Sequence, residues 1–484
     1  MQQVSDKALV RQQAYINGAW VDATGGKTFD VSNPATGDVL GTVPDMGAKE
    51  TEDAVRAAAA AFPAWRDMVA AERAALLQKW AALQIEHLDD LARILTLEQG
   101  KPLKEAKGEA QSGSGYVSWM AEESRRIYGD ITPPRDSAHR FLTLKQPVGV
   151  CGMITPWNFP SSMITRKCGP ALAAGCTVVL KPSDLTPYSA LALAVLAERA
   201  GIPKGVINIV TGKDAAAIGK VLTDSDTVRK ISFTGSTAVG KKLMAQCADT
   251  VKKVSLELGG NAPFIVFDDA DIDAAVEGAI ASKFRNAGQT CICANRIFVQ
   301  DGIYDVFAKK FTAAVAAMKM GSGLDDDTDI GPVIASQAIE KVTRQLEDAK
   351  SKGGKVVTGG TAHALGGLFY QQTVITGATP DMQCFSEETF GPLAPLFRFK
   401  TDEDVVKMAN DTPYGLAAYF YSRDMSRIWR MAEALEYGMV GVNSVAVVAP
   451  QVPFGGWKQS GIGCEGSRYG IDEYLEKKLV SMRV

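Results

Sequence analysis

The chain has 484 residues, of which 46% are hydrophobic and 22% charged, with a formal net charge of −3. This composition is typical of a globular protein with two or three domains, and the near-neutral charge argues against nucleic acid as a partner. The longest apolar runs, such as 171–180, are too short to cross a membrane, and the polar N-terminus has no signal-peptide core. Eight cysteines without a framework spacing fit a reducing compartment, so we expect a cytoplasmic protein.

The first 148 residues change from strands to helices and back. Turn signals such as Asn17-Gly18 predict short strands over 14–45, and alanine-rich stretches then predict helices at 51–62, 70–97 and 112–126. Thr51 is the predicted cap of the first helix. Residues 131–148 are predicted to be extended, and they interrupt two similar regions. This segment is either a simple edge hairpin or an arm that serves oligomerisation.

A strand–loop–helix pattern repeats from residue 148. Strands are predicted at 148–155, 177–180, 206–210 and 230–233, and the helices after the last three at 188–200, 215–222 and 238–248. This alternation predicts an α/β protein with a doubly wound parallel sheet, in which ligands bind beyond the carboxyl ends of the strands. No Gly-x-Gly-x-x-Gly motif follows these strands. Gly235-Ser-Thr-Ala-Val-Gly240 has another spacing, consistent with a dinucleotide phosphate site or with a plain turn.

A second α/β unit is predicted from about residue 260. Its expected strands lie at 263–267 and 296–300, and its expected helices at 271–285, 304–318 and 424–437. The polar loop Glu387–Pro392 lies within this unit. The glycine-rich loop Pro453–Gly463 and a strand-like tail at 478–484 end the chain.

Two cysteines lie in a loop of small polar residues, Gly288-Gln-Thr-Cys-Ile-Cys-Ala-Asn295. Most cysteines are small buried hydrophobes, but this loop favours a nucleophile at Cys291. A zinc site is disfavoured, because Cys-x-Cys supplies two of the four ligands and no nearby pair completes the set. The histidines His87, His139 and His363 lie outside any motif. The predicted base is therefore a carboxylate, Glu257, which would activate water against a covalent acyl intermediate.

Several motifs, in this order and spacing, resemble those of the NAD(P)-dependent aldehyde dehydrogenases along essentially the whole chain. They are Thr155-Pro-Trp-Asn-Phe-Pro160, Lys181-Pro-Ser183, Phe233-Thr-Gly-Ser236, Glu257-Leu-Gly-Gly260, Gly288-Gln-Thr-Cys291, Glu387-Glu-Thr-Phe-Gly-Pro392 and Pro453-Phe-Gly-Gly456. Four further features are similar to the succinate-semialdehyde dehydrogenases: Met163–Lys167, Lys283–Asn286, the Cys291–Cys293 pair and Glu465–Ile471.

The resemblance implies an aldehyde dehydrogenase-like fold of three parts. These are a Rossmann-like cofactor domain at 1–126 and 148–257, an α/β catalytic domain at 258–440, and a small β oligomerisation arm at 127–147 and 465–484. It also implies a homodimer or homotetramer, because the arm would pair with a neighbour's sheet.

The resemblance further implies roles for individual residues. Cys291 would attack the aldehyde, the Asn158 side chain and the Cys291 backbone N–H would hold the oxyanion, and Glu257 would activate water. Implied contacts to NAD or NADP come from Thr155, Pro156, Trp157, Lys181, Ser183, Asp184, Gly212, Ser236, Leu258, Glu388 and Phe390. Arg166 and Arg285 are implied in the aldehyde pocket, where their guanidinium groups suit an anion. The alternative for these two is a pair of unrelated arginines on helix surfaces.

Two positions depart from the family pattern. Asp184 stands where NAD-preferring members usually carry Glu, and Lys181 and Ser183 beside it could accept a 2′-phosphate, so we expect both cofactors to work. The stretch Ala446–Gln451 lacks the Ser that helps to hold the substrate carboxylate in the semialdehyde dehydrogenases. Succinate semialdehyde is therefore the leading substrate, with glutarate semialdehyde, 2-oxoglutarate semialdehyde or sulfolactaldehyde as the alternative.

Two other functions compete with an aldehyde oxidoreductase. A non-catalytic protein of this fold would be expected to lose Cys291 or Glu257, and a thiol hydrolase or acyl transferase would not need Lys181, Ser236 and Glu388. Cys293 adds a redox hypothesis. An activated Cys291 thiolate could pair with it under peroxide, unless Cys293 is buried and inert.

Overall fold

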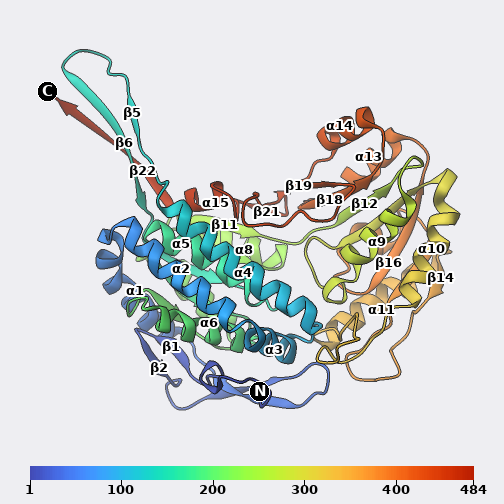
Figure 1. Cartoon of the computed structure of the whole chain (residues 1–484), viewed down its shortest axis with the longest axis horizontal. Helices are drawn as coiled ribbons and strands as arrows, with labels where there is room; N and C mark the ends of the chain where they lie inside the picture. The colour runs from blue at the N-terminus through green and yellow to red at the C-terminus, as the bar shows by residue number, and fades with distance from the viewer.

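The computed structural model describes all 484 residues as two α/β bodies with a β arm projecting from the first (Figure 1). An eight-stranded sheet forms the centre of the first body, in the order β2-β1-β9-β8-β7-β10-β11-β21. Its strands are β1 (Ala14–Ile16), β2 (Ala19–Val21), β7 (Val150–Ile154), β8 (Thr177–Lys181), β9 (Ile207–Ile209), β10 (Val228–Thr234), β11 (Lys253–Glu257) and β21 (Gly461–Ile462). The five strands from β9 to β11 are parallel.

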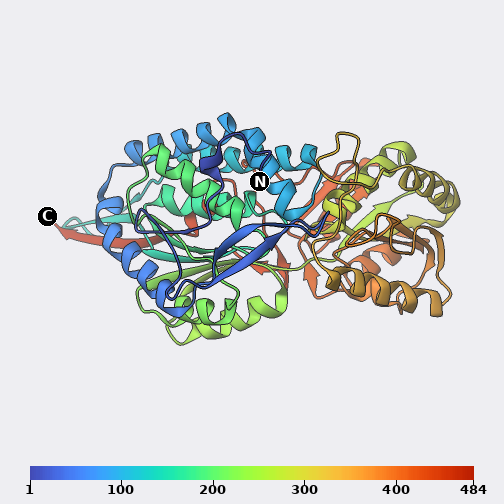
Figure 2. The same ribbon diagram turned by 90° about the horizontal axis from the view of Figure 1, so that it is seen from below.

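Helices cover both faces of this sheet, as Figure 2 shows. They are α1 (Ala48–Asp67), α2 (Ala70–Glu86), α3 (Leu88–Gln99), α4 (Leu103–Ser124), α5 (Ser162–Ala174), α6 (Pro187–Ala200), α7 (Ala215–Asp224) and α8 (Thr237–Ala248). The strands are apolar on both sides for this reason. In β8, Val178 and Leu180 join the core under α2 to α6, whereas Val179 joins the core under α1, α7 and α8.

The second body has a seven-stranded sheet in the order β14-β15-β16-β13-β12-β18-β19, parallel except for β14. Its strands are β12 (Ala262–Val266), β13 (Ala294–Gln300), β14 (Lys355–Thr358), β15 (Thr373–Ala378), β16 (Leu393–Phe399), β18 (Ala417–Tyr421) and β19 (Met439–Val442). One apolar core lies under α9 (Ile272–Lys283) and α10 (Tyr304–Ala316). The other lies under α11 (Ser336–Ser351), α12 (Gln383–Ser386), α13 (Asp402–Asn410) and α14 (Met425–Ala434).

The arm is a three-stranded sheet of β5 (Asp130–Thr132), β6 (His139–Pro147) and β22 (Leu475–Arg483). β6 and β22 pair antiparallel from Pro147–Leu475 to His139–Arg483, and together they project away from the first body (Figure 1). Ile131, Leu144 and Leu479 of this sheet are exposed. No helix of the structure is long and apolar enough to cross a membrane.

The remaining elements are short. They are η1 (Lys7–Leu9), η2 (Arg285–Gly288) and η3 (Asp301–Ile303), the hairpin β3 (Thr28–Ser32) and β4 (Val39–Pro44), the pair β17 (Tyr414–Gly415) and β20 (Trp457–Lys458), and α15 (Tyr469–Asp472). The glycine-rich loop Pro453–Gly463 returns to the first body, because β21 within it pairs with β11 of the first sheet.

Several sequence predictions were wrong in their boundaries. The single helix predicted at 70–97 is two helices that meet at His87, and the helix predicted from residue 112 begins at Leu103. Thr51 is not a cap: α1 begins at Ala48 after Gly47, and the Thr51 hydroxyl donates to the Gly47 carbonyl from within the first turn (2.7 Å). The helix predicted at 424–437 ends at Ala434, because Leu435 turns to the extended backbone that leads into β19.

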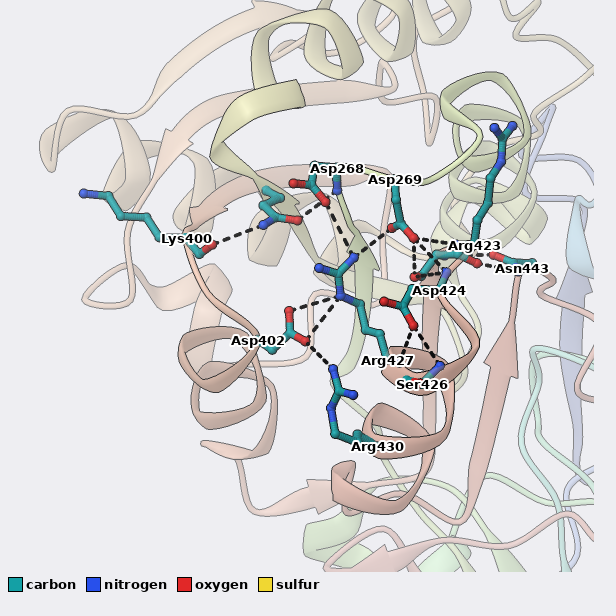
Figure 3. Close-up of polar contacts among 12 residues, drawn as sticks. Asp268, Asp269, Lys400, Asp402, Arg423, Asp424, Ser426, Arg427, Arg430 and Asn443 are labelled. Atoms are coloured by element: carbon teal, nitrogen blue, oxygen red, sulfur yellow. Dashed lines mark hydrogen bonds and ion pairs between the residues drawn. The ribbon is translucent and has the colours of Figure 1, made fainter.

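A charged network fastens α13 and α14 to the carboxyl ends of β12 and β18 (Figure 3). The Arg427 guanidinium contacts the carboxylates of Asp269 (2.9 Å) and Asp402 (3.2 Å), and it stacks on the Phe267 ring at 4.6 Å. Asp269 also accepts hydrogen bonds from the backbone N–H groups of Arg423 and Asp424. Because Arg427 is mostly buried, this network has a structural role in the second body.

We expect Arg427→Met to lower the thermal midpoint of unfolding by several degrees, because it leaves two partly buried carboxylates without their shared cation. A loss of about 1–3 kcal/mol corresponds to roughly 2–6 °C for a domain of this size. Arg430→Met is the matched control, since Arg430 contacts only Asp402 and is 63% exposed. Equal shifts for both variants in differential scanning fluorimetry would contradict the assignment.

Candidate active site

Two cavities meet at the sulfur of Cys291, between the carboxyl ends of the two sheets. The first, of about 350 Å³, is lined by Pro156, Trp157, Asn158, Thr234, Gly235, Ser236, Leu258, Gly259, Cys291, Gln337, Ala338, Lys341, Glu388, Thr389 and Phe390. The second, of about 220 Å³, is lined by Glu109, Ser112, Phe159, Ser162, Met163, Arg166, Arg285, Thr290, Cys291, Ile292, Val448 and Phe454. Of these residues only Cys291 lines both, so one thiol can be reached from two sides.

The loop that carries Cys291 begins with strained backbone. Asn286, Ala287 and Gly288 have φ of +51°, +55° and +75°, a left-handed conformation that costs Asn and Ala about 1 kcal/mol each. The Asn286 N–H donates to a Glu105 carboxylate oxygen at 2.8 Å, which helps to hold this turn. A Cβ on Gly260 would lie 2.2 Å from the Cys291 carbonyl oxygen, so only glycine allows this close approach.

Asn158 and the Cys291 backbone are arranged as an oxyanion hole. Asn158 is 3% exposed, and its side-chain amide donates one hydrogen bond to the Gln289 carbonyl at 3.1 Å. An amide has two N–H groups, so one stays free toward the cavity. The Cys291 backbone N–H donates to no other residue of the protein. Two unused donors beside the sulfur suit a developing alkoxide.

The surroundings of the Cys291 side chain favour the neutral thiol. Burial, and after it the negative charge of Glu388, raises the pKa of this thiol to about 12, and the Arg166 guanidinium only partly opposes them. The raised pKa does not favour the activated thiolate on which the redox hypothesis depends. A proton must leave the sulfur during catalysis, because only the thiolate is a strong nucleophile.

Glu257 ends β11 with a buried carboxyl group whose two oxygens have no hydrogen-bond partner. Burial, and after it the neighbouring Glu465 carboxylate, raises the pKa of Glu257 well above its usual range, while Lys167 and Arg166 lower it in part. Glu465 is held by the buried Lys167 ammonium at 2.7 Å. A raised pKa suits a base that must work near neutral pH. The sequence assigned no role to Glu465 or Lys167, although both lie in motifs that carried the family resemblance.

Arg166 lies in the second cavity, on α5. Its guanidinium is sandwiched between the rings of Tyr116 (4.7 Å) and Phe454 (4.8 Å), and its Nε and Nη1 atoms are buried without a hydrogen-bond partner. Arg285 is exposed at the edge of the same cavity, with its guanidinium 5.1 Å from the Phe159 ring. The cavity thus offers one buried and one exposed cation to an anionic group.

The stretch that lacks the expected hydroxyl contributes an apolar residue to the second cavity. In the stretch Ala446–Gln451, Val448 is the residue that lines the second cavity. The hydroxyl-bearing residues around this cavity are instead Ser112, Ser162 and Thr290, from the opposite elements. Sequence analysis missed Ser112 and Tyr116, because nothing in the sequence of α4 indicates that its side chains reach the site.

The first cavity has the features of a dinucleotide site. Ser236 caps α8, its Oγ accepting the Val239 N–H at 3.4 Å, and the free N–H groups of that first turn favour a phosphate. The Glu388 carboxylate accepts the Gly260 N–H at 3.0 Å, and burial raises the pKa of Glu388 to about 7. Phe390 has φ of +53° and meets Trp157 edge-on at 5.6 Å. Such strained backbone is typical of ligand sites.

Not all the predicted cofactor residues lie in this cavity. Pro156, Trp157, Ser236, Leu258, Glu388 and Phe390 line it, whereas Thr155, Lys181, Ser183, Asp184 and Gly212 lie outside, at the ends of β7, β8 and β9. Thr155 joins two of these strands through its N–H, which donates to the Lys181 carbonyl at 3.1 Å. Gln337 and Lys341 of α11 line the cavity and were missed, because the sequence analysis predicted no element between residues 318 and 387.

Cys293 is buried beneath the loop. Its thiol donates to the Lys283 carbonyl at 3.3 Å, and burial raises its pKa. This placement favours the inert alternative over a redox pair with Cys291. No group of three or more His, Cys, Asp and Glu side chains is arranged to hold a metal ion.

The fold and this arrangement define an enzyme of the aldehyde dehydrogenase class. The family model for the aldehyde dehydrogenase family matches residues 20–480, and the chain belongs to that family. This confirms the resemblance and the predicted fold class. The chain is 59% identical to the Escherichia coli succinate-semialdehyde dehydrogenase [NADP(+)] GabD, over 98% of each chain.

Two further relatives bear other substrate names. A glutarate-semialdehyde dehydrogenase of Pseudomonas aeruginosa is 58% identical over 99% of each chain. A 3-sulfolactaldehyde dehydrogenase of Pseudomonas putida is 58% identical over 100% of this chain and 99% of its own. A crystal structure of succinate-semialdehyde dehydrogenase from Burkholderia pseudomallei matches with a TM-score of 0.99 at 58% identity and 100% coverage of both chains.

We expect Glu465→Gln to shift the pH profile of the water-dependent step to lower pH by about one unit. Glu257 must be ionised to act as a base, so activity rises as the pH passes its raised pKa. Removing the Glu465 charge lowers that pKa, and the freed Lys167 ammonium lowers it further. The measurement is kcat against pH. Glu476→Gln is the control, because Glu476 is exposed in a surface pair with Lys253 and its profile should match the wild type.

Proposed function

We propose that this enzyme oxidises a short aldehyde with an acid group at its far end, using NAD or NADP, and that succinate semialdehyde is the leading substrate. The observation that carries this proposal is the buried Arg166 guanidinium, which lacks partners for Nε and Nη1 in a cavity that ends at Cys291. The Glu465 carboxylate lies 4.0 Å from Nη1, too far for a hydrogen bond, and a buried charged donor without an acceptor is costly, so a substrate anion is a suitable partner.

The reaction begins on the sulfur. The Cys291 thiol gives its proton to a solvent water molecule as Sγ bonds to the aldehyde carbon, and the carbonyl oxygen becomes an alkoxide held by the Asn158 amide and the Cys291 N–H. A nicotinamide cofactor, when bound, supplies the acceptor for the hydride that leaves this carbon. The residue that remains on Cys291 is a thioester. Glu257 then takes a proton from water, whose oxygen attacks the thioester carbon and releases the acid and the thiol.

The cofactor would be held by both bodies. Ser236 and the first turn of α8 are suited to the pyrophosphate, and Glu388 to a ribose hydroxyl, with Lys341 on the opposite wall. Thr155, Lys181, Ser183, Asp184 and Gly212, at the ends of the first sheet's strands, would hold the adenosine end. Asp184 is partly exposed beside the buried Lys181, so the pair can accept either a ribose hydroxyl or a 2′-phosphate. We therefore expect the enzyme to turn over with both NAD and NADP.

Glutarate semialdehyde and sulfolactaldehyde are the second candidates. The observation that favours them is Val448, because an apolar wall replaces the hydroxyl that would complete a carboxylate site. Ser112 and Ser162, on the other side of the cavity, could bind an acid group that is longer or tetrahedral. The substrate is therefore proposed as a class, the acid-bearing short aldehydes, with succinate semialdehyde first.

The arm is proposed to assemble a homodimer or homotetramer. Its sheet exposes apolar side chains and an unpaired edge of β22, which a lone subunit would leave in water. The domain division set out above, with a cofactor domain, a catalytic domain and this arm, is proposed on the same grounds. All eight cysteines are free thiols, which supports a reducing cytoplasm as the location.

The assignment of nucleophile and base is tested with succinate semialdehyde and either cofactor. We expect Cys291→Ala to abolish formation of the reduced nicotinamide. Glu257→Gln should give one burst of reduced cofactor per subunit and then stall, because the thioester forms but water is not activated. Stopped-flow absorbance at the reduced nicotinamide band measures both. Wild-type turnover by Glu257→Gln would contradict the assignment of the base.

Recognition of the substrate's acid group is tested by substituting the two arginines of the second cavity. We expect Arg166→Gln and Arg285→Gln to lower kcat/KM for succinate semialdehyde by roughly tenfold to hundredfold, since a charge-assisted hydrogen bond contributes about 1.5–3 kcal/mol. Butanal, a neutral aldehyde of the same length, should lose little. Arg56→Gln, at a 67% exposed side chain far from the site, is the control. Equal losses for both aldehydes would mean that these arginines do not read the acid.

A further inference from the structure

We infer that Lys101, Glu105 and Glu109, spaced four residues apart before and along the start of α4, are positioning residues that fix the oxyanion loop against the nucleophile loop. The inference rests on the acyl chemistry proposed above. None of the three is placed by the mechanism on a reacting atom. Lys101 and Glu105 each make a direct polar contact with one of the two catalytic loops, and Glu109 contacts the start of α5 that follows the oxyanion loop.

Lys101 acts on Asn158 through the backbone. Its ammonium group is fully buried and donates to the Asn158 carbonyl oxygen at 2.8 Å. The Asn286 side-chain amide donates to the same oxygen at 2.9 Å. Both lone pairs of the Asn158 carbonyl are thus occupied, one by Lys101 just before α4 and one by Asn286 of the nucleophile loop. The Asn158 side chain returns a hydrogen bond to Gln289, so the residue is held at both ends.

The two glutamates complete the connection. Glu109 pairs with Lys101 through one carboxylate oxygen, and its other oxygen accepts the N–H groups of Ser161 (2.9 Å) and Ser162 (3.1 Å), where α5 begins. Glu105 accepts the Asn286 N–H at the strained turn before Cys291. One stripe of α4 therefore contacts the oxyanion loop, the start of α5 and the nucleophile loop.

The cost of this arrangement supports a role beyond stability. The side chains of Lys101 and Glu109 are 0% and 1% exposed, and burying two charges costs several kcal/mol before their attraction is counted. Apolar side chains of equal size would often be as stable. What they could not supply is a donor for the Asn158 carbonyl. The pair lies at the junction of the two bodies, where the Leu103 N–H donates to the Gly323 carbonyl at 2.8 Å.

The test separates position from stability with two variants. Lys101→Met leaves the buried Glu109 carboxylate unpaired, so we expect a lower thermal midpoint and a slower burst of hydride transfer. Lys101→Met/Glu109→Gln removes both charges but keeps an acceptor for Ser161 and Ser162. We expect its thermal midpoint to return toward the wild-type value, while the burst rate stays roughly tenfold to hundredfold low, the scale of a misplacement of about 1 Å.

Two further readouts identify the cause. The cofactor Kd, measured by quenching of tryptophan fluorescence, should stay within about twofold of the wild type, so the loss falls on kcat. Lys107→Met is the matched control on α4, because Lys107 is 45% exposed in a surface pair with Asp89 and should change neither stability nor rate. If the burst rate of the double variant recovered together with its thermal midpoint, the pair would be structural only and the inference overturned.

Measuring the burst with two aldehydes separates the test of this inference from the test of the proposed substrate. The burst should slow by the same factor with succinate semialdehyde and with butanal, because the oxyanion is common to both. A loss confined to the acidic aldehyde would overturn the inference, since it would assign the pair to acid binding through α5 and Arg166. If the wild type showed no preference for the acidic aldehyde, the substrate proposal would fail, and the comparison with butanal would still decide the role of Lys101.

Discussion

The site depends on one constraint: a single sulfur atom must be reached from two cavities at once. Cys291 meets this constraint because it lies between the carboxyl ends of two separate parallel sheets, where ligands gather in folds of this kind. Glu257 ends β11 of the first sheet, and the nucleophile loop leads into β13 of the second. Gly260 connects them, and its missing side chain lets the two strands' loops touch. The proposed base and the proposed nucleophile therefore come from different bodies.

Burial sets the chemistry of this junction. The Cys291 thiol, the Glu257 carboxyl and the Glu388 carboxyl all have raised pKa values, and burial is the largest cause for each. Burial at this junction favours the neutral forms of Cys291 and Glu257, whereas Glu388, with a pKa of about 7, ionises near neutral pH. The few fixed cations, Arg166 and Lys167, then have a large influence, because little solvent screens them. Glu465 pairs with Lys167 at 2.7 Å and also lies 4.0 Å from Arg166 Nη1, so of the two cations Arg166 is the one with unused hydrogen-bond donors.

The sequence predicted the reacting groups better than the walls around them. Cys291, Glu257 and Asn158 lie in short polar motifs at strand ends, and such motifs are visible without a structure. Between residues 318 and 424, by contrast, α11, β14 to β16 and α13 carry no motif, so Gln337 and Lys341 were missed. The contacts of Lys101 and Glu109 could not be predicted either. Lys101 lies 57 residues before Asn158, and Glu109 lies 52 residues before Ser161. Only the packing of α4 against α5 brings these residues together.

Boundary errors have local causes of the same kind. The split at His87 has no proline or glycine to mark it, and the end of α14 at Ala434 is set by where the chain must enter β19. The hypothesis of an activated thiolate is opposed by the surroundings of Cys291 in the fold. The loop residues around Cys291 are small and polar in sequence, which favoured a nucleophile over a core cysteine. In the folded protein these polar groups hydrogen-bond one another, as Asn286, Gln289 and Asn158 show, and Cys291 itself is only partly buried.

Selectivity for an acid-bearing aldehyde would then come mainly from the cost of binding a neutral aldehyde, and less from attraction of the acid group. Two nitrogen atoms of Arg166 are buried without acceptors between the rings of Tyr116 and Phe454. A neutral aldehyde leaves them unpaired in the closed cavity, and an unsatisfied charged donor costs at least about 1–3 kcal/mol. An acidic aldehyde removes this cost on binding. A site that leaves its own polar groups unpaired with the wrong ligand discriminates more strongly than one that only adds apolar contact. Val448 on the opposite wall would then set how the acid group lies, since it offers shape and no donor.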